Sequence, residues 1–140
     1  MSLDKNRNTL DRLLAMRFAA HPWHGVPIGD RAPDEVTVYV EIVPTDAIKY
    51  ELDKGSGHLR IDRPQLYSSF SPALYGFIPQ TYCGVTVGQR CAERCGRANI
   101  EGDHDPMDIC VLSERDVSHS GVLLRARPIG GLRMIDKNQA

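Results

Sequence analysis

Residues 36–42 constrain the fold more than any other stretch, because their hydrophobic period is two. The apolar members are Val36, Val38, Val40 and Ile42, and they alternate with Thr37, Tyr39 and Glu41. Successive side chains of a β-strand point to opposite faces, so this alternation predicts a strand with one apolar face. Pro44 closes the strand. The chain therefore needs a sheet whose apolar face is covered by a hydrophobic core.

Further short strand patterns follow along the chain, separated by turn residues. They cover residues 49–53, 58–63, 107–112, 122–128 and 132–135. Between the first two, the composition of residues 54–57 (Lys-Gly-Ser-Gly) predicts a hairpin turn. No helical pattern alternates with the strands, which argues against a parallel α/β sheet. The sequence predicts a mainly β fold, with a small antiparallel barrel or sandwich as its natural closure.

The ends of the strand region are less regular. Residues 8–18 predict an N-terminal helix that Pro22 ends, and residues 21–29 form a connector anchored by Trp23. We therefore divide the chain into residues 1–34, a helix and connector, and residues 35–140, the barrel domain.

Two internal stretches show no strand pattern. Residues 64–82 are rich in proline and aromatic residues and predict loops, while residues 83–102 are polar, contain four glycines and predict a surface excursion. Two metal-binding alternatives stay open here and in the connector. One is a zinc site of Cys91, Cys95 and either Cys83 or His104, although its spacings fit no standard zinc pattern; the other uses His21 and His24.

Length and composition place the chain among ordinary soluble domains with one core. It has 140 residues, 41% hydrophobic and 25% charged, and a net charge of −1. That charge gives no global attraction for nucleic acid, and no apolar run approaches the length that crosses a bilayer. Charged residues interrupt any secretory signal in residues 1–20. We expect a cytoplasmic protein with reduced cysteines and neither a nucleic-acid nor a membrane partner.

Three carboxylates, Asp103, Asp105 and Asp108, fall within six residues, directly before a strand. Carboxylates so close repel one another, and a divalent cation with a preference for oxygen ligands relieves that repulsion. The spacing is not that of an EF-hand, because Met107 and Asp108 stand where its loop needs Asp or Asn and then Gly. A solvated acidic turn is the alternative.

Charges of both signs stand at the ends of the predicted strands. The further acidic residues are Glu41, Glu51 and Asp136, and the basic ones are Lys49, Arg63 and Arg127. If they converge, the acids can hold two or more Mg²⁺ ions and the bases a polyanion, which is the layout of a two-metal phosphoryl-transfer site. The alternative is a set of surface salt bridges.

Several ordered motifs resemble those of the family I soluble inorganic pyrophosphatases. The matching segments are Glu41-Ile-Val-Pro44, Ile48-Lys49-Tyr50-Glu51-Leu52-Asp53, Ile61-Asp62-Arg63, Leu74-Tyr75-Gly76-Phe77-Ile78-Pro79, Gly102-Asp103-His104-Asp105-Pro106-Met107-Asp108 and Arg127-Pro128-Ile129-Gly130-Gly131-Leu132-Arg133-Met134-Ile135-Asp136. They run over about residues 35–136. The His21–Gly25 segment and residues 81–84 are similar to a bacterial subgroup that includes the chlamydial enzymes.

The resemblance implies an OB-type five-stranded antiparallel barrel and Mg²⁺-dependent hydrolysis of pyrophosphate to two phosphates, with Mn²⁺ as a possible substitute. It implies the following roles: Asp103, Asp105, Asp108, Asp136 and Glu41 as metal ligands, Asp105 also as general base, Lys49 and Arg63 as phosphate ligands, Tyr75 as a hydrogen-bond donor to substrate near the nucleophile, and Glu51 as support for the metal shell. It also implies a homo-oligomer, a hexamer or a trimer.

Three departures from the family pattern accompany the resemblance. His104 stands where a small or polar residue is usual, and Ser71 stands where many members have tyrosine. The family pattern also continues beyond Asp136 with more metal and phosphate ligands and with covering helices, which this chain lacks, so we expect it to be part of a longer enzyme. The alternatives are a non-catalytic paralogue and an OB-type binding module.

Overall fold

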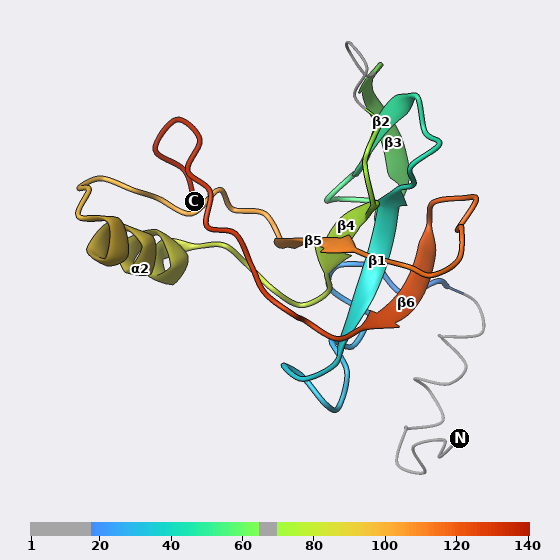
Figure 1. Ribbon diagram of the computed structural model, residues 1–140, viewed down its shortest axis with the longest axis horizontal. Helices are drawn as coiled ribbons and strands as arrows, with labels where there is room; N and C mark the ends of the chain where they lie inside the picture. The colour runs from blue at the N-terminus through green and yellow to red at the C-terminus, as the bar shows by residue number, and fades with distance from the viewer. Residues whose placement is uncertain (1–17, 65–69) are drawn as a thin grey trace.

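β1 is the central strand of the structure and has a partner on each side. The computed structural model describes residues 18–64 and 70–140. Four strands form its larger sheet, and their bounds are β1 (Val36–Ile42), β4 (Leu74–Ile78), β5 (Met107–Val111) and β6 (Val122–Ala126). All pairs are antiparallel and the order is β5-β4-β1-β6. Figure 1 shows β1 running between β4 and β6.

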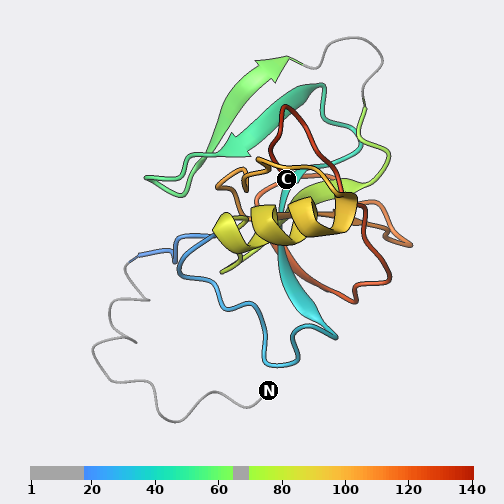
Figure 2. The ribbon, with the colours of Figure 1, turned by 90° about the vertical axis from the view of Figure 1, so that its left-hand side faces the viewer.

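A second, two-stranded sheet is the predicted hairpin of β2 (Ile48–Leu52) and β3 (Leu59–Pro64). In its turn, the Asp53 amide donates to the His58 carbonyl and the Gly57 amide donates to the Asp53 carbonyl, both at 2.8 Å. Figure 2 shows the hairpin at one end of the larger sheet. The predicted mainly β class is confirmed: residues 18–64 and 70–140 contain six strands in two antiparallel sheets.

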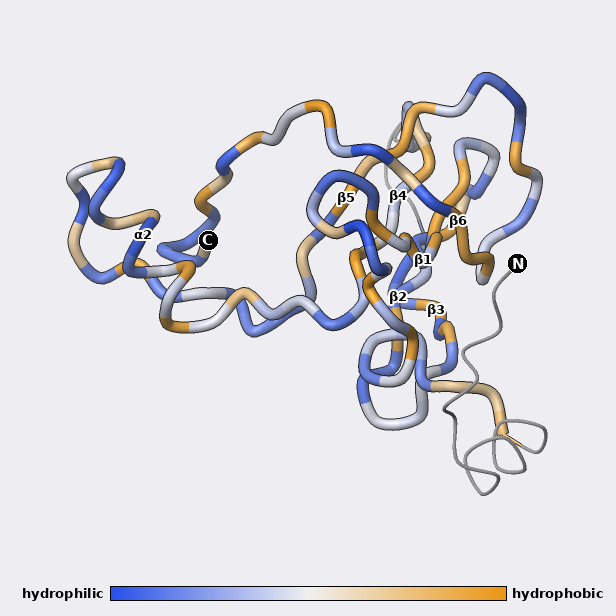
Figure 3. Tube along the Cα trace, turned by 90° about the horizontal axis from the view of Figure 1, so that it is seen from below, coloured by the Kyte–Doolittle hydropathy of each residue, from blue (hydrophilic) through white to orange (hydrophobic). Residues whose placement is uncertain are grey.

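Both faces of β1 are buried, so the strand separates two apolar clusters. One cluster contains Val36, Val38, Val40, Val43, Leu74 and Ile78. The other contains Trp23, Tyr39, Leu52 and Phe77. A β-bulge between Val40 and Ile42 shifts the alternation, so Val43 rather than Ile42 joins the first cluster. Figure 3 shows this concentration of hydrophobic residues along β1 and its neighbours.

The predicted surface excursion at residues 83–102 contains a helix that was not predicted, α2 (Val85–Cys95). Gly84 precedes the helix, and Gly96 ends it in the left-handed conformation, at φ 66°. Gly88 lets the helix approach the backbone of residues 100–101, because a Cβ there would lie 2.6 Å from the Ile100 carbonyl oxygen. The polar composition and the four glycines of this stretch are unusual for a helix. Here Gly96 ends the helix and Gly88 allows it to pack closely.

Two other local predictions also need correction. Residues 64–82 were expected to be loops, but β4 lies within them and pairs with both β1 and β5. Residues 132–135 were expected to be a strand, but they pair with no strand in the described ranges. Leu132 and Met134 are exposed, so this segment has no sheet to bury its apolar side chains.

The predicted N-terminal helix at residues 8–18 lies almost wholly outside the described residues. The connector after it behaves as predicted: Trp23 is buried, and its indole N–H donates to the Thr81 carbonyl at 2.7 Å. Within residues 18–64 and 70–140, no helix is long and apolar enough to cross a membrane.

The close contact of β1 with β4 makes Gly76 a sensitive position. A Cβ built there would lie 1.9 Å from the Tyr39 carbonyl oxygen, so Gly76→Ala forces the two central strands apart. We expect a loss of about 2 kcal/mol or more in the free energy of unfolding. Urea unfolding of both proteins measures this loss. Gly130→Ala is the control, because a Cβ at Gly130 meets nothing within 4 Å; equal stability of the two variants would contradict the prediction.

Candidate active site

A cavity of about 150 Å³ lies where the β2–β3 hairpin meets β1, β4 and the loop before β5. Its lining residues are Trp23, Glu41, Lys49, Tyr50, Glu51, Leu52, Lys54, Tyr75, Phe77, Asp103, Asp105, Pro106 and Asp108. Five of them are carboxylates and two are lysines, so the cavity carries an excess of negative charge. The sequence predicted most of its polar wall: seven of the nine predicted site residues line it.

Alternation along β1 places Glu41 on the same face as Tyr39, and from there it forms part of this wall. Glu41 is 8% exposed, and its Oε1 accepts a hydrogen bond of 2.8 Å from the Leu52 amide of β2. Burial, reinforced by repulsion from Asp108 and Glu51, raises the pKa of Glu41 to about 7, while the Leu52 amide and Lys49 oppose the rise. Because burial and the neighbouring carboxylates disfavour the charged form of Glu41, a cation bound beside it would stabilise that form.

Tyr75 and Asp108 meet across the neighbouring strands β4 and β5. The Tyr75 hydroxyl donates a hydrogen bond of 2.6 Å to Asp108 Oδ2. Partial desolvation, with repulsion from Asp103 and Asp105, raises the pKa of Asp108, although the Tyr75 hydrogen bond opposes this. Desolvation and the bond to Asp108 also raise the pKa of Tyr75. Tyr75 therefore remains a neutral hydroxyl at any physiological pH.

Asp105 faces a cation that sequence reasoning missed. Lys54 Nζ, from the β2–β3 turn, forms an ion pair with Asp105 Oδ1. That oxygen is buried and has no other hydrogen-bond partner among the described residues. A lysine in a glycine-rich turn looks like a solvent-exposed residue in the sequence, and only the position of the hairpin beside the loop before β5 brings it to the cavity. The apolar wall of Trp23 and Phe77 was missed for a similar reason.

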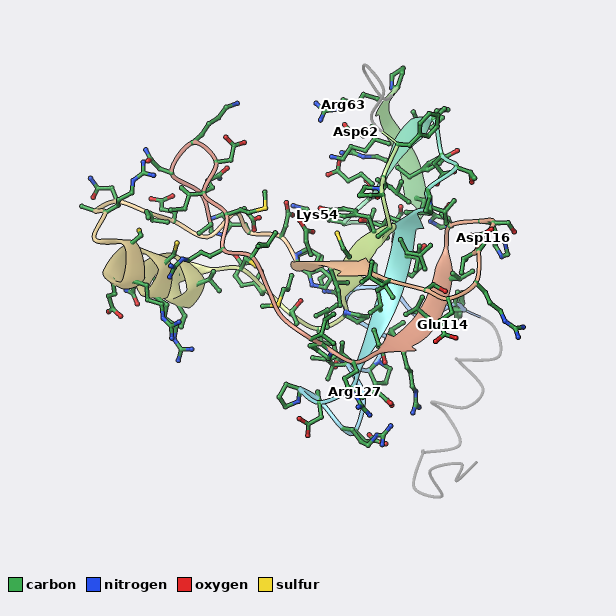
Figure 4. All side chains as sticks on the ribbon, viewed as in Figure 1. Lys54, Asp62, Arg63, Glu114, Asp116 and Arg127 are labelled. Carbon is green, nitrogen blue, oxygen red and sulfur yellow. The ribbon has the colours of Figure 1, made fainter. Side chains whose placement is uncertain are left out.

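Two predicted site residues do not line the cavity. Arg63 is exposed at the end of β3, where its Nε lies 3.9 Å from Asp62 Oδ2; Figure 4 shows it at the end of the hairpin away from Lys54. Lys49 also contacts Asp62, at 3.3 Å, so one carboxylate faces both cations. Asp136 is exposed in a turn with Gln139. The predicted roles of Arg63 and Asp136 rest on the resemblance.

The donor chemistry of the cavity fits a hard divalent cation. All five carboxylates offer oxygen ligands, and Asp105 Oδ1 is a buried oxygen whose one partner among the described residues is the Lys54 ammonium. Across the described ranges, no three His, Cys, Asp or Glu side chains are gathered closely enough to hold one ion. This finding gives no support to the zinc and histidine alternatives in this part of the chain, and it applies equally to the carboxylates of the cavity, which are not gathered around one point. His21 Nδ1 instead accepts from the amides of Trp23 and His24.

The buried carboxylate of Glu41 makes stability depend on pH. Its pKa is about 7 in the folded chain against an ordinary 4.5, so its contribution is full below about pH 4.5 and is lost as the pH rises through 7. Glu41→Gln keeps an acceptor for Leu52 without the charge. In metal-free buffer we expect it to be more stable than the parent at pH 8, by roughly 1–3 kcal/mol, and equal to it at pH 4.

Thermal unfolding at the two pH values measures this difference. Glu114→Gln is the control, because Glu114 is exposed in the loop after β5 and outside the cavity. A parent chain as stable as Glu41→Gln at pH 8 would show that the buried charge is harmless.

Comparison with known proteins gives one consistent result. The family model for inorganic pyrophosphatase matches residues 38–140. An inorganic pyrophosphatase of Chlamydia caviae is 50% identical over 120 residues, which is 86% of this chain and 56% of that protein. A soluble inorganic pyrophosphatase of Solanum tuberosum is 38% identical over 96% of this chain and 54% of its own length. The chain thus spans little more than half the length of these relatives.

The structure agrees with the sequence comparison. The crystal structure of inorganic pyrophosphatase from Ehrlichia chaffeensis has a TM-score of 0.56 and 36% identity, over 74% of this chain and 55% of that one. The enzyme from Thermus thermophilus gives a TM-score of 0.57 and 29% identity, over 78% of this chain and 51% of that one. On the family match, the identity to relatives and the shared fold, the chain belongs to the inorganic pyrophosphatase family.

Proposed function

We propose that the protein to which this chain belongs hydrolyses inorganic pyrophosphate to two phosphates with the help of Mg²⁺. One observation carries the proposal: five carboxylates and two lysines converge on one small cavity in a chain of the inorganic pyrophosphatase family. A cavity of about 150 Å³ suits a small polyanion and its cations better than a nucleotide. The relatives carry the same activity in their names.

The carboxylates would hold the cations and one of them would move a proton. We assign Asp103, Asp105, Asp108, Asp136 and Glu41 as metal ligands, with Glu51 in support. Bound Mg²⁺ would supply Lewis-acid neutralisation of the phosphate charge, and Mn²⁺ offers the same chemistry. Asp105 is the proposed general base: its carboxylate lines the cavity, and release of the ion pair between its Oδ1 and Lys54 Nζ would free that oxygen to take a proton.

The remaining polar residues would bind and orient the substrate. Lys49 and Arg63 lie opposite each other in the β2–β3 register. Both can therefore approach one phosphate group when their ion pairs with Asp62 are broken. The Tyr75 hydroxyl, which stays protonated, would donate to a phosphate oxygen or to the attacking water. Trp23 and Phe77 would keep bulk water from one side of the cavity.

The setting of this activity also belongs to the proposal. We propose a cytoplasmic enzyme that forms a homo-oligomer, a trimer or a hexamer, with no nucleic-acid or membrane partner. Residues 1–34 would be a helix and connector, and residues 35–140 the barrel domain.

Asp105→Asn tests the chemistry with little change in shape. Without a proton acceptor, phosphate release from pyrophosphate in Mg²⁺ should fall by about 100-fold or more. A colorimetric phosphate assay measures the rate, both in the 140-residue chain and in the longer protein to which it belongs. Glu114→Gln is the matched control and should retain the parent rate, because its lost charge lies outside the cavity.

The same assay separates the alternatives. Thermal stabilisation by pyrophosphate without phosphate release would favour a binding paralogue. An active Asp105→Asn variant would contradict the role of Asp105. Salt-sensitive binding of single-stranded oligonucleotides would favour an OB-type binding module.

A further inference from the structure

A short segment, residues 81–83, supports the loop that carries the aspartates. We call residues 102–108 the aspartate loop and residues 81–83 the support segment. The Cys83 amide donates to the Asp105 carbonyl at 2.8 Å, and the His104 amide donates to the Cys83 carbonyl at 2.9 Å. The Met107 amide donates to Thr81 Oγ1 at 2.8 Å. The loop is thus attached to the support segment at both ends of the Asp103–Asp105 turn.

His104 is the central residue of that turn and has an unusual backbone conformation. Its φ is +65°, in the left-handed region, which is uncommon for any residue other than glycine. Around it, the Asp105 amide donates to Asp103 Oδ1 at 2.9 Å, which closes an Asx-turn. Both aspartates line the cavity. A residue in an unfavourable backbone conformation persists when other contacts hold it there, so His104 needs an anchor.

Tyr82 provides this anchor. Its hydroxyl and His104 Nδ1 share a hydrogen bond of 2.5 Å, in which the hydroxyl donates when Nδ1 is unprotonated. The Tyr82 ring also stacks on Trp23, with centroids 6.4 Å apart. Trp23 is 8% exposed and is fixed in turn by its bond to the Thr81 carbonyl. A continuous set of contacts therefore runs from the core through Trp23 and Tyr82 to the aspartate loop.

We infer that Tyr82 and His104 are positioning residues, whose hydrogen bond sets how Asp103 and Asp105 face the cavity. The inference rests on the proposed function in so far as the cavity binds Mg²⁺. Tyr82 is 57% exposed, so loss of its hydroxyl leaves no buried void and affects global stability little. Loss of a group that orients a metal ligand, in contrast, weakens metal affinity by about 10- to 100-fold.

Four variants separate the effect of the Tyr82–His104 hydrogen bond from effects of the ring and of the backbone conformation. Tyr82→Phe keeps the ring and removes the hydroxyl. His104→Gly keeps the left-handed backbone but removes the anchor, while His104→Asn suits the same backbone and places Oδ1 where Nδ1 lies, so it should rescue the contact. Tyr39→Phe is the matched control, because Tyr39 lies on β1 and does not line the cavity.

Two measurements apply to each variant of the 140-residue chain. Amide hydrogen exchange at Cys83, His104 and Met107 reports the loop without any metal. Calorimetric titration with Mg²⁺ reports its affinity. In Tyr82→Phe and His104→Gly, we expect exchange faster by roughly 5- to 10-fold and Mg²⁺ affinity weaker by about 10-fold. His104→Asn and Tyr39→Phe should resemble the parent in both.

The outcomes distinguish this inference from the proposed function. Unchanged exchange in Tyr82→Phe, or equal losses in His104→Gly and His104→Asn, would overturn the positioning role. Faster exchange with an unaltered Mg²⁺ affinity would overturn the link to the carboxylates. Faster exchange in Tyr82→Phe and His104→Gly, together with a parent chain that binds no Mg²⁺ at all, would uphold the anchor and contradict the metal site of the proposed function.

Discussion

The hydrogen bond from the Leu52 amide to the Glu41 carboxylate joins the two sheets of this protein. It is buried, and it holds the edge of the hairpin against the central strand at the mouth of the cavity. A carboxylate makes a strong acceptor for a backbone amide but is costly to bury. The structure uses this group both to connect its parts and to line its most acidic surface. Fold and site therefore depend on the same charge.

The strands with a clear period of two were predictable, because the alternation of residue types marks the two faces of a strand even where, as in β1, both faces are buried. β4 was not, because Leu74–Ile78 lacks this alternation and contains Gly76, whose missing side chain lets β1 approach. The bulge at Glu41 was hidden as well, since an inserted residue leaves the composition of a strand unchanged. Such features are set by neighbours that are distant in the sequence.

The candidate site likewise contains residues that could be predicted from the sequence and residues that could not. Asp103, Asp105 and Asp108 were evident because like charges so close in sequence need a reason. Lys54 and Tyr82 were not, because a lysine in a turn and a tyrosine in a loop are ordinary until the fold shows what they face. Arg63 and Asp136 were predicted from charges at strand ends and from family resemblance, but neither lines the cavity; they contact Asp62 and Gln139 instead.

Trp23 gives this arrangement a practical consequence. It is the single tryptophan of the chain, it lines the cavity, and it is stacked between His24 and Tyr82. Indole emission responds to the polarity and charge around the ring, so the site contains its own optical probe. Ultraviolet excitation selective for tryptophan would report events at the carboxylates without a label, and every photon would come from one known place in the fold.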